Sequence, residues 1–178
     1  MANLTAFTTY GNYRKVFSIP YTFRIANAIR IYGGSLCGLP GANALTSSRG
    51  YLVRWQNQIN IQWAGIAEVQ SWTGGLVTAA QTGTAANVNT VLGDTSATPV
   101  PEISVETGPL ILGNVTVTGV SAQADVWRTL IYCSTDNYSD FTTTSTSYAP
   151  AIGKVLYWYT STTADVYLFG MLRMTAIS

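Results

Sequence analysis

The chain has 178 residues, of which 47% are hydrophobic and only 10% are charged, and it contains no histidine. This length fits one domain of ordinary size, which can bury a full hydrophobic core without cross-links. Histidine is the usual general base, proton shuttle and metal ligand near neutral pH, so its absence argues against an enzyme or a metal protein.

The net charge of +1 combines two segments of opposite sign. Residues 1–60 carry six arginines or lysines and no acid, whereas the rest of the chain carries three basic and eight acidic residues. The two segments could meet within or between subunits, or the basic one could dock on an acidic protein surface. Nucleic acid is a weaker third option, because six cations spread over sixty residues make a poor phosphate track.

Neither export nor membrane insertion is expected. No stretch approaches the roughly 18 uninterrupted apolar residues of a membrane helix, and the N-terminus lacks the basic and apolar regions of a secretory signal. Cys37 and Cys133 lie far apart and lack C-x-x-C spacing. We therefore expect both to be reduced and buried in a protein made in the cytoplasm.

Apolar residues recur at every second position along most of the chain, which is the period of a half-buried strand. Only residues 121–125 suggest a helical turn, so we expect helix content under about 10%. The candidate strands, in chain order, are residues 16–25, 28–32, 51–55, 58–63, 103–106, 110–112, 114–118, 126–133, 141–147, 155–159 and 165–171. So many short strands predict an all-β fold, either an antiparallel β-sandwich or a small β-barrel.

Two segments differ from this pattern. Residues 1–24 form an extended N-terminal arm, whose first dozen residues are too polar to build a core. Residues 25–178 form a single β-domain, interrupted by a long loop insertion at residues 73–101 with a possible hairpin at residues 88–92. Loops of that length usually have a task, such as reaching a neighbouring subunit.

The candidate catalytic motifs are better explained as structure. Asp136 and Asp140 lie between two candidate strands, where such residues favour turns, and they lack the spacing of a calcium loop. A glycine-lysine pair ends at Lys154, but Tyr148 and Val155 stand where a phosphate loop needs glycine and Ser or Thr. We therefore predict no catalytic residue, no cofactor and no bound metal.

Aromatic residues alternate along one candidate strand. Neighbouring strand residues point to opposite faces, so Tyr157 and Tyr159 share one face and Trp158 takes the other. Such a strand should be covered on both sides, by the fold or by a partner subunit. The chain's eleven tyrosines and five tryptophans could also form a sugar-binding platform, which leaves a carbohydrate-binding module as an alternative.

Two blocks of the chain follow an order of short elements seen in a known family. The first comprises IRIYGGSLCGL (residues 29–39), GYLV (50–53) and GIAE (65–68). The second comprises LIYCSTDN (residues 130–137), a Thr/Ser strand, IGKV (152–155) and DVYL (165–168). In this order and spacing the chain resembles the capsid decoration, or cement, proteins of tailed bacteriophages. It departs from their pattern through about Phe23 and at residues 73–101.

The resemblance implies a viral structural protein without catalytic residues. Such a β-domain sits on the outer surface of the phage head in the virion and stabilises contacts between subunits of the major capsid protein. It is usually a symmetric oligomer, here a homodimer or homotrimer, and binds neither nucleic acid nor membrane. A phage fibre or tail component is the nearest alternative.

The departures from the family pattern are where we expect the contacts. We predict that the segment through Arg30 and the loop at residues 73–101 touch the shell and neighbouring subunits. The predicted interface side chains are Arg14, Lys15, Phe17, Tyr21, Phe23, Arg24 and Trp72.

Overall fold

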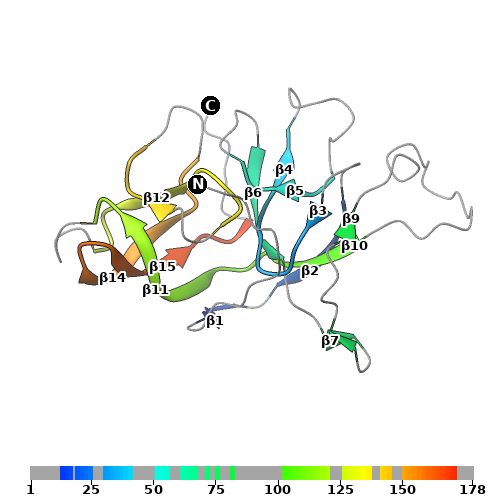
Figure 1. Cartoon of the computed structure of the whole chain (residues 1–178), viewed down its shortest axis with the longest axis horizontal. Helices are drawn as coiled ribbons and strands as arrows, with labels where there is room; N and C mark the ends of the chain where they lie inside the picture. Colours follow the sequence, from blue (N-terminus) through cyan, green and yellow to red (C-terminus); the bar gives the residue numbers. More distant parts are fainter. Residues whose placement is uncertain are drawn as a thin grey trace, which may run out of the picture.

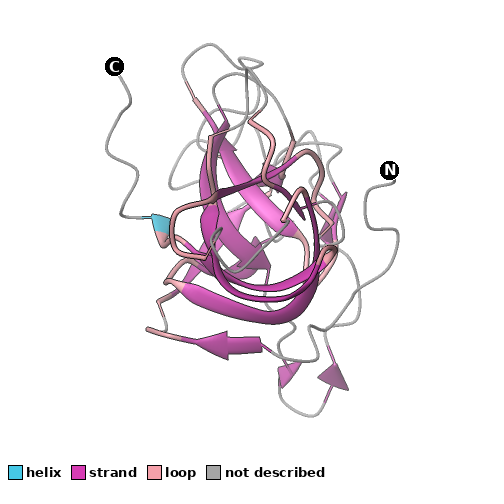
Figure 2. Ribbon diagram, turned by 90° about the vertical axis from the view of Figure 1, so that its left-hand side faces the viewer, coloured by secondary structure: helices cyan, strands magenta, loops and turns pink. Residues whose placement is uncertain are grey.

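The structure is a computed structural model of the chain (Figure 1). It describes residues 13–17, 19–25, 30–41, 51–56, 61–67, 71–72, 75–76, 81–82, 102–120, 126–137, 141–145 and 150–171. Within these ranges the chain forms strands, turns and one residue of 3₁₀ conformation at Met171, drawn in cyan in Figure 2. It forms no α-helix there, which confirms the all-β prediction. None of their elements is a helix that could cross a membrane. The predicted helical turn at residues 121–125 and hairpin at residues 88–92 lie outside the described residues.

The larger sheet contains a closed barrel. Its strands, in spatial order, are β1 (Tyr13–Lys15), β11 (Leu110–Thr118), β13 (Phe141–Thr142), β12 (Leu130–Cys133), β14 (Gly153–Thr160) and β15 (Thr163–Leu168). Because β11 also pairs with β15, the last five strands close into a ring, and β1 is attached outside it. Of the two architectures predicted, the barrel is therefore present in this half of the molecule.

The second sheet lies beside the barrel (Figure 1). Its strands, in spatial order, are β2 (Pro20–Arg24), β10 (Glu102–Glu106), β6 (Ile61–Ala67), β4 (Leu36–Pro40) and β5 (Val53–Arg54). Its two edges approach each other, because Ile25 and Leu52 form a parallel bridge. Two short pairs complete the strands, β3 (Arg30–Ile31) with β9 (Gln81–Thr82) and β7 (Ser71–Trp72) with β8 (Gly75–Leu76).

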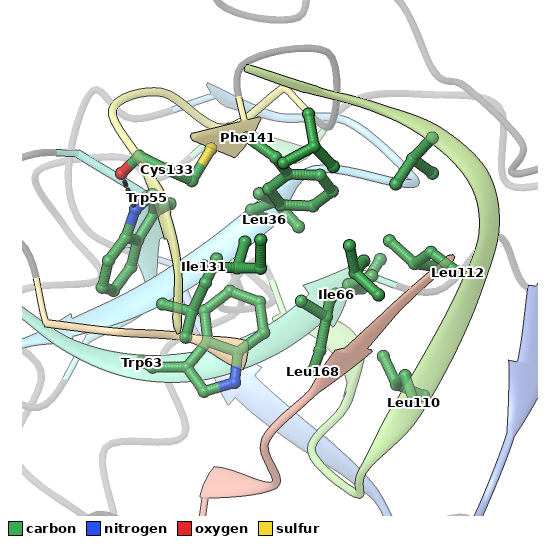
Figure 3. Close-up of a cluster of buried hydrophobic side chains, with 14 of the residues drawn as sticks. Leu36, Trp55, Trp63, Ile66, Leu110, Leu112, Ile131, Cys133, Phe141 and Leu168 are labelled. Atoms are coloured by element: carbon green, nitrogen blue, oxygen red, sulfur yellow. Dashed lines mark hydrogen bonds between the residues drawn. The ribbon is translucent and has the colours of Figure 1, made fainter. Parts of the chain in front are cut away.

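Two hydrophobic clusters form the core. The larger fills the barrel and continues onto one face of β4, β5 and β6, where Trp55 and Trp63 pack edge to face (Figure 3). Their indole nitrogens donate across the junction, to the carbonyl oxygen of Cys133 at 2.6 Å and to that of Phe169 at 2.7 Å. The smaller cluster, which includes Phe23 and Cys37, covers the other face of the second sheet. The junction between barrel and sheet is thus buried and hydrogen-bonded.

Strand β6 is buried on both faces because it lies between these clusters. Cys37 pairs with Gly65 and Gly38 pairs with Trp63, so Ala64 is the extra residue of a β-bulge. Trp63 faces the barrel cluster and Ala64 the second cluster. The carbonyl of Glu106 occupies the space that a Cβ on Gly65 would fill, and Gly65 has a φ of 146°. A side chain there would strain the backbone.

Most predicted strands are present, but their ends differ. The alternation at residues 114–118 is confirmed, because Val115 and Val117 are buried whereas Asn114, Thr116 and Thr118 are exposed. The strand predicted at residues 126–133 begins only at Leu130, because residues 126–129 turn and Trp127 has a φ of 65°. The strand predicted at residues 16–25 begins at Pro20, and the one predicted at residues 141–147 ends at Thr142.

Candidate interaction surfaces

The arm lies along the segment that connects the two sheets. Residues 13–24 run antiparallel to residues 102–112, with β1 paired to β11 and β2 paired to β10. Between these strands the amide of Val16 donates to the carbonyl of Pro109 at 3.0 Å. The amide of Thr107 likewise donates to the carbonyl of Ile19 at 3.0 Å. This part of the arm is therefore bound to both halves of the molecule.

A buried carboxylate anchors the middle of the arm. Glu106 is fully buried, and its Oε1 accepts hydrogen bonds from the amides of Ile19 at 2.6 Å and Gly108 at 3.2 Å. The hydroxyl of Thr107 donates to the carbonyl of Ile19 at 2.6 Å. Bonds from backbone amides to a carboxylate are charge-assisted, and the buried charge needs such partners. These hydrogen bonds fix the backbone of the arm at Ile19, between the exposed residues Phe17 and Tyr21.

The arm presents apolar side chains to solvent. Phe17 is 65% exposed and Tyr21 is 60% exposed, and Val16 and Arg14 are exposed beside them. The carbonyl of Phe17 lies where a Cβ on Gly108 would stand, so the arm passes very close to the chain beneath it. We call Arg14, Val16, Phe17 and Tyr21 the arm surface.

The remaining predicted interface residues have other positions. Phe23 is buried in the second cluster, and its ring packs against that of Tyr21, with the two centroids 4.8 Å apart. Arg24 forms an exposed ion pair with Glu102, at 3.6 Å between Nε and Oε1. This pair is one contact between the basic first segment and the acidic remainder of the chain. Lys15 lies in β1 and Trp72 in β7, and the structure describes their backbones only.

A second group of exposed apolar side chains lies on the outside of the barrel. Trp127 is 59% exposed, Tyr157 49% and Tyr159 47%, and Leu130 is also exposed. Tyr157 and Tyr159 do share a face, whereas Trp158 packs against the core, as the alternation predicts. We call these four exposed residues the barrel wall. None of them is among the predicted interface residues.

The arm surface and the barrel wall lie on different sides of the barrel. In the ring of strands the order is β11, β13, β12, β14 and β15, returning to β11. The arm is attached to β11, and the pair β12 and β14 is the part of the ring farthest from it. The two surfaces can therefore be occupied at the same time.

The acidic turn after β12 is structural. Asp136 is fully buried, and its Oδ2 accepts a hydrogen bond from the hydroxyl of Ser35 at 3.2 Å. Burial, helped by the charge of Asp136, raises the pKa of Cys37 well above its usual range. Neither Cys37 nor Cys133 forms a disulfide, and both are buried, as predicted. Asp140 lies outside the described residues, within which no group of three or more acids and cysteines could hold a metal ion.

Comparison with known proteins found no match to a family model, to a curated protein or to a solved structure.

Proposed function

We propose that this chain is a capsid decoration protein, which binds the outer surface of a tailed-phage head and stabilises contacts between major capsid subunits. The two sequence blocks that resemble this family support the proposal. The physical character of the chain fits it, because low charge and exposed aromatic residues suit a large static interface. Many copies acting together on one particle would add to the affinity of each.

The arm surface is the observation that carries this proposal. Phe17 and Tyr21 are large apolar side chains exposed on the same segment as the exposed Arg14, and backbone hydrogen bonds hold this segment to both halves of the molecule. Aromatic residues with a neighbouring arginine are the usual anchors of protein interfaces. A segment fixed in this way loses little conformational entropy when it binds. We assign the contact with the major capsid protein to this surface.

Binding to phage heads tests the proposal. Purified chain is mixed with undecorated heads of the phage that encodes it, the heads are sedimented, and bound chain is quantified. We expect saturable binding at a fixed number of copies per head and a higher temperature of head rupture. Absence of binding, or binding to a glycan array alone, would overturn the proposal in favour of another module.

Two double variants test the assignment of the surface. Replacing Phe17 and Tyr21 with alanine should weaken head binding about tenfold or more, because exposed aromatic anchors dominate such interfaces. Replacing Thr116 and Thr118 with alanine changes two exposed side chains of β11 that belong to neither surface, and this variant is the control. Deleting residues 2–12 tests the rest of the arm. If this deletion leaves the number of bound copies per head unchanged, residues 2–12 are excluded from the contact.

A further inference from the structure

The barrel wall lies on the outward face of three paired strands, β12, β14 and β15. Side chains of Ile131, Val155 and Val166 point into the barrel, so their neighbours along each strand point outward. A β-bulge between Val155 and Tyr157 shifts the alternation, so that Tyr157 also points outward. The register places Leu130 beside Lys154 and Lys154 beside Tyr167, and it pairs Tyr157 with Asp165. Leu130 and Tyr157 are exposed, and the other three are partly exposed. Apolar, aromatic and charged side chains therefore alternate across one sheet face.

Trp127 extends this face at a cost in backbone energy. Its amide donates to the carbonyl of Val155 at 2.8 Å, which fixes the turn beside β14. Its φ of 65° is a left-handed conformation that a bulky residue rarely adopts. Such conformations are costly in free energy and persist where the surrounding structure imposes them. Here the result is a tryptophan kept 59% exposed next to other exposed aromatic residues.

The geometry of the tyrosines does not suit a sugar. The rings of Tyr157 and Tyr159 are inclined at 63° with centroids 4.8 Å apart, so they offer no flat platform for a pyranose. The carboxylate of Asp165 holds Tyr159 in this orientation. One oxygen of Asp165 accepts from the hydroxyl of Tyr159 at 3.0 Å, and the other accepts from the amide of Asn114 at 2.7 Å. A protein surface fits this face better than a glycan.

The charges on this face complement one another. Lys154 lies between Leu130 and Tyr167, Arg128 is exposed in the turn before β12, and Asp165 lies on β15, the strand next to that of Lys154. A contact related by a two-fold axis brings the same patch of two subunits together, so the patch must complement itself. A face with both signs of charge around aromatic residues meets that requirement, because a cation of one copy can face the carboxylate of the other.

We propose that the barrel wall binds the barrel wall of a second copy of this chain, forming a two-fold symmetric dimer. Trp127, Leu130, Tyr157 and Tyr159 lie at its centre, and Lys154 of one subunit faces Asp165 of its partner. This contact leaves the arm surface free. Self-association requires no phage head, so its failure is distinguishable from failure of the decoration proposal.

Sedimentation equilibrium of the purified full chain tests the dimer. The wild-type chain should sediment as a dimer over a concentration series. Tyr157→Lys should weaken the dimer about tenfold or more, because it places a charge in the apolar centre. Tyr21→Lys changes an equally exposed tyrosine on the arm and should leave the dimer intact. Near-ultraviolet circular dichroism checks that both variants are folded.

Cysteine cross-linking gives a second readout. Both native cysteines are buried, so a cysteine placed at Leu130, Tyr157 or Tyr159 is the accessible thiol of the chain. Under mild oxidation, at least one of these three variants should form a disulfide-linked dimer, and Tyr21→Cys should remain monomeric on a non-reducing gel. A monomeric or trimeric wild-type chain, a dimer unaffected by Tyr157→Lys, or cross-linking by Tyr21→Cys alone would overturn the proposal.

Discussion

Ser35 and Asp136 are separated by 101 residues, yet both are fully buried and the hydroxyl of Ser35 donates to Asp136 Oδ2 at 3.2 Å. The amide of Leu36 also donates to the carbonyl of Asp136, at 3.0 Å. Ser35 precedes β4 in the second sheet, and Asp136 follows β12 in the barrel. These bonds join the two sequence blocks on which the family resemblance rests.

Loss of the Asp136 carboxylate should destabilise the whole chain. Asp136→Ala leaves the buried hydroxyl of Ser35 without its acceptor and removes a buried carboxylate, so we expect the free energy of unfolding to fall by about 1–3 kcal/mol. Ser35→Ala removes one partner of a single bond and should cost about 1 kcal/mol. Urea denaturation measures both. Glu102→Ala, in an exposed ion pair, is the control and should change stability by less than about 0.5 kcal/mol.

An enzyme would respond differently at this position. If Asp136 were catalytic, Asp136→Asn would abolish an activity while the fold stayed equally stable. We expect the reverse, a measurable loss of stability and no activity to lose. Wild-type stability in the Asp136→Ala variant would contradict the structural role of this residue.

The arm should detach locally when its anchor is removed. Glu106→Ala leaves the amides of Ile19 and Gly108 without the carboxylate, and each such loss costs about 1–3 kcal/mol. We expect amides of residues 19–24 to exchange with deuterium faster, while those of the barrel keep their protection. Glu106→Gln keeps an acceptor oxygen and should have a smaller effect. Equal exchange in all three chains would show that Glu106 does not hold the arm.

The pH dependence of stability follows from two observations. The chain has no histidine, so no side chain with an ordinary pKa titrates between about pH 6 and 8. The folded-state pKa of Cys37 is raised by burial above its ordinary value of 9.0. The folded state therefore favours the protonated thiol, and this contribution is constant below about pH 9 and is lost at higher pH.

We accordingly expect a free energy of unfolding that is flat between about pH 6 and 8 and declines above about pH 9. Denaturation at a series of pH values measures the profile. Cys37→Ala removes the buried thiol and should weaken the alkaline decline. Head binding should likewise change little between about pH 6 and 8. A steep change in either quantity within that window would contradict the account.

Local pattern was enough to predict many of the strands, but it missed β4, and it could not show how the strands pair. The period of two identified Val115 and Val117 as buried and placed Tyr157 and Tyr159 on one face. It could not show which face lacks a covering layer, because that depends on the order of strands in the ring. Trp127 resembles an ordinary strand residue in sequence, and its left-handed conformation comes from the turn beside β14.

The buried acids were equally difficult to predict. Asp136 and Glu106 lie in sequence contexts typical of a surface turn and a strand end. Their partners, the Ser35 hydroxyl and the Ile19 amide, are far away in sequence. The arm surface was found because Phe17 and Tyr21 are apolar in a segment otherwise rich in polar residues. Phe23, two positions further along, is apolar for a different reason, since it belongs to the core.

An electron cryomicroscopy map of heads saturated with the chain tests the decoration proposal most directly. The account predicts extra density on the outer surface at a fixed number of copies. In that density the arm, with Phe17 and Tyr21, faces the major capsid protein, and the barrel wall faces away from the shell. Bare heads after saturation, or density in which the barrel wall contacts the shell and the arm points to solvent, would contradict it.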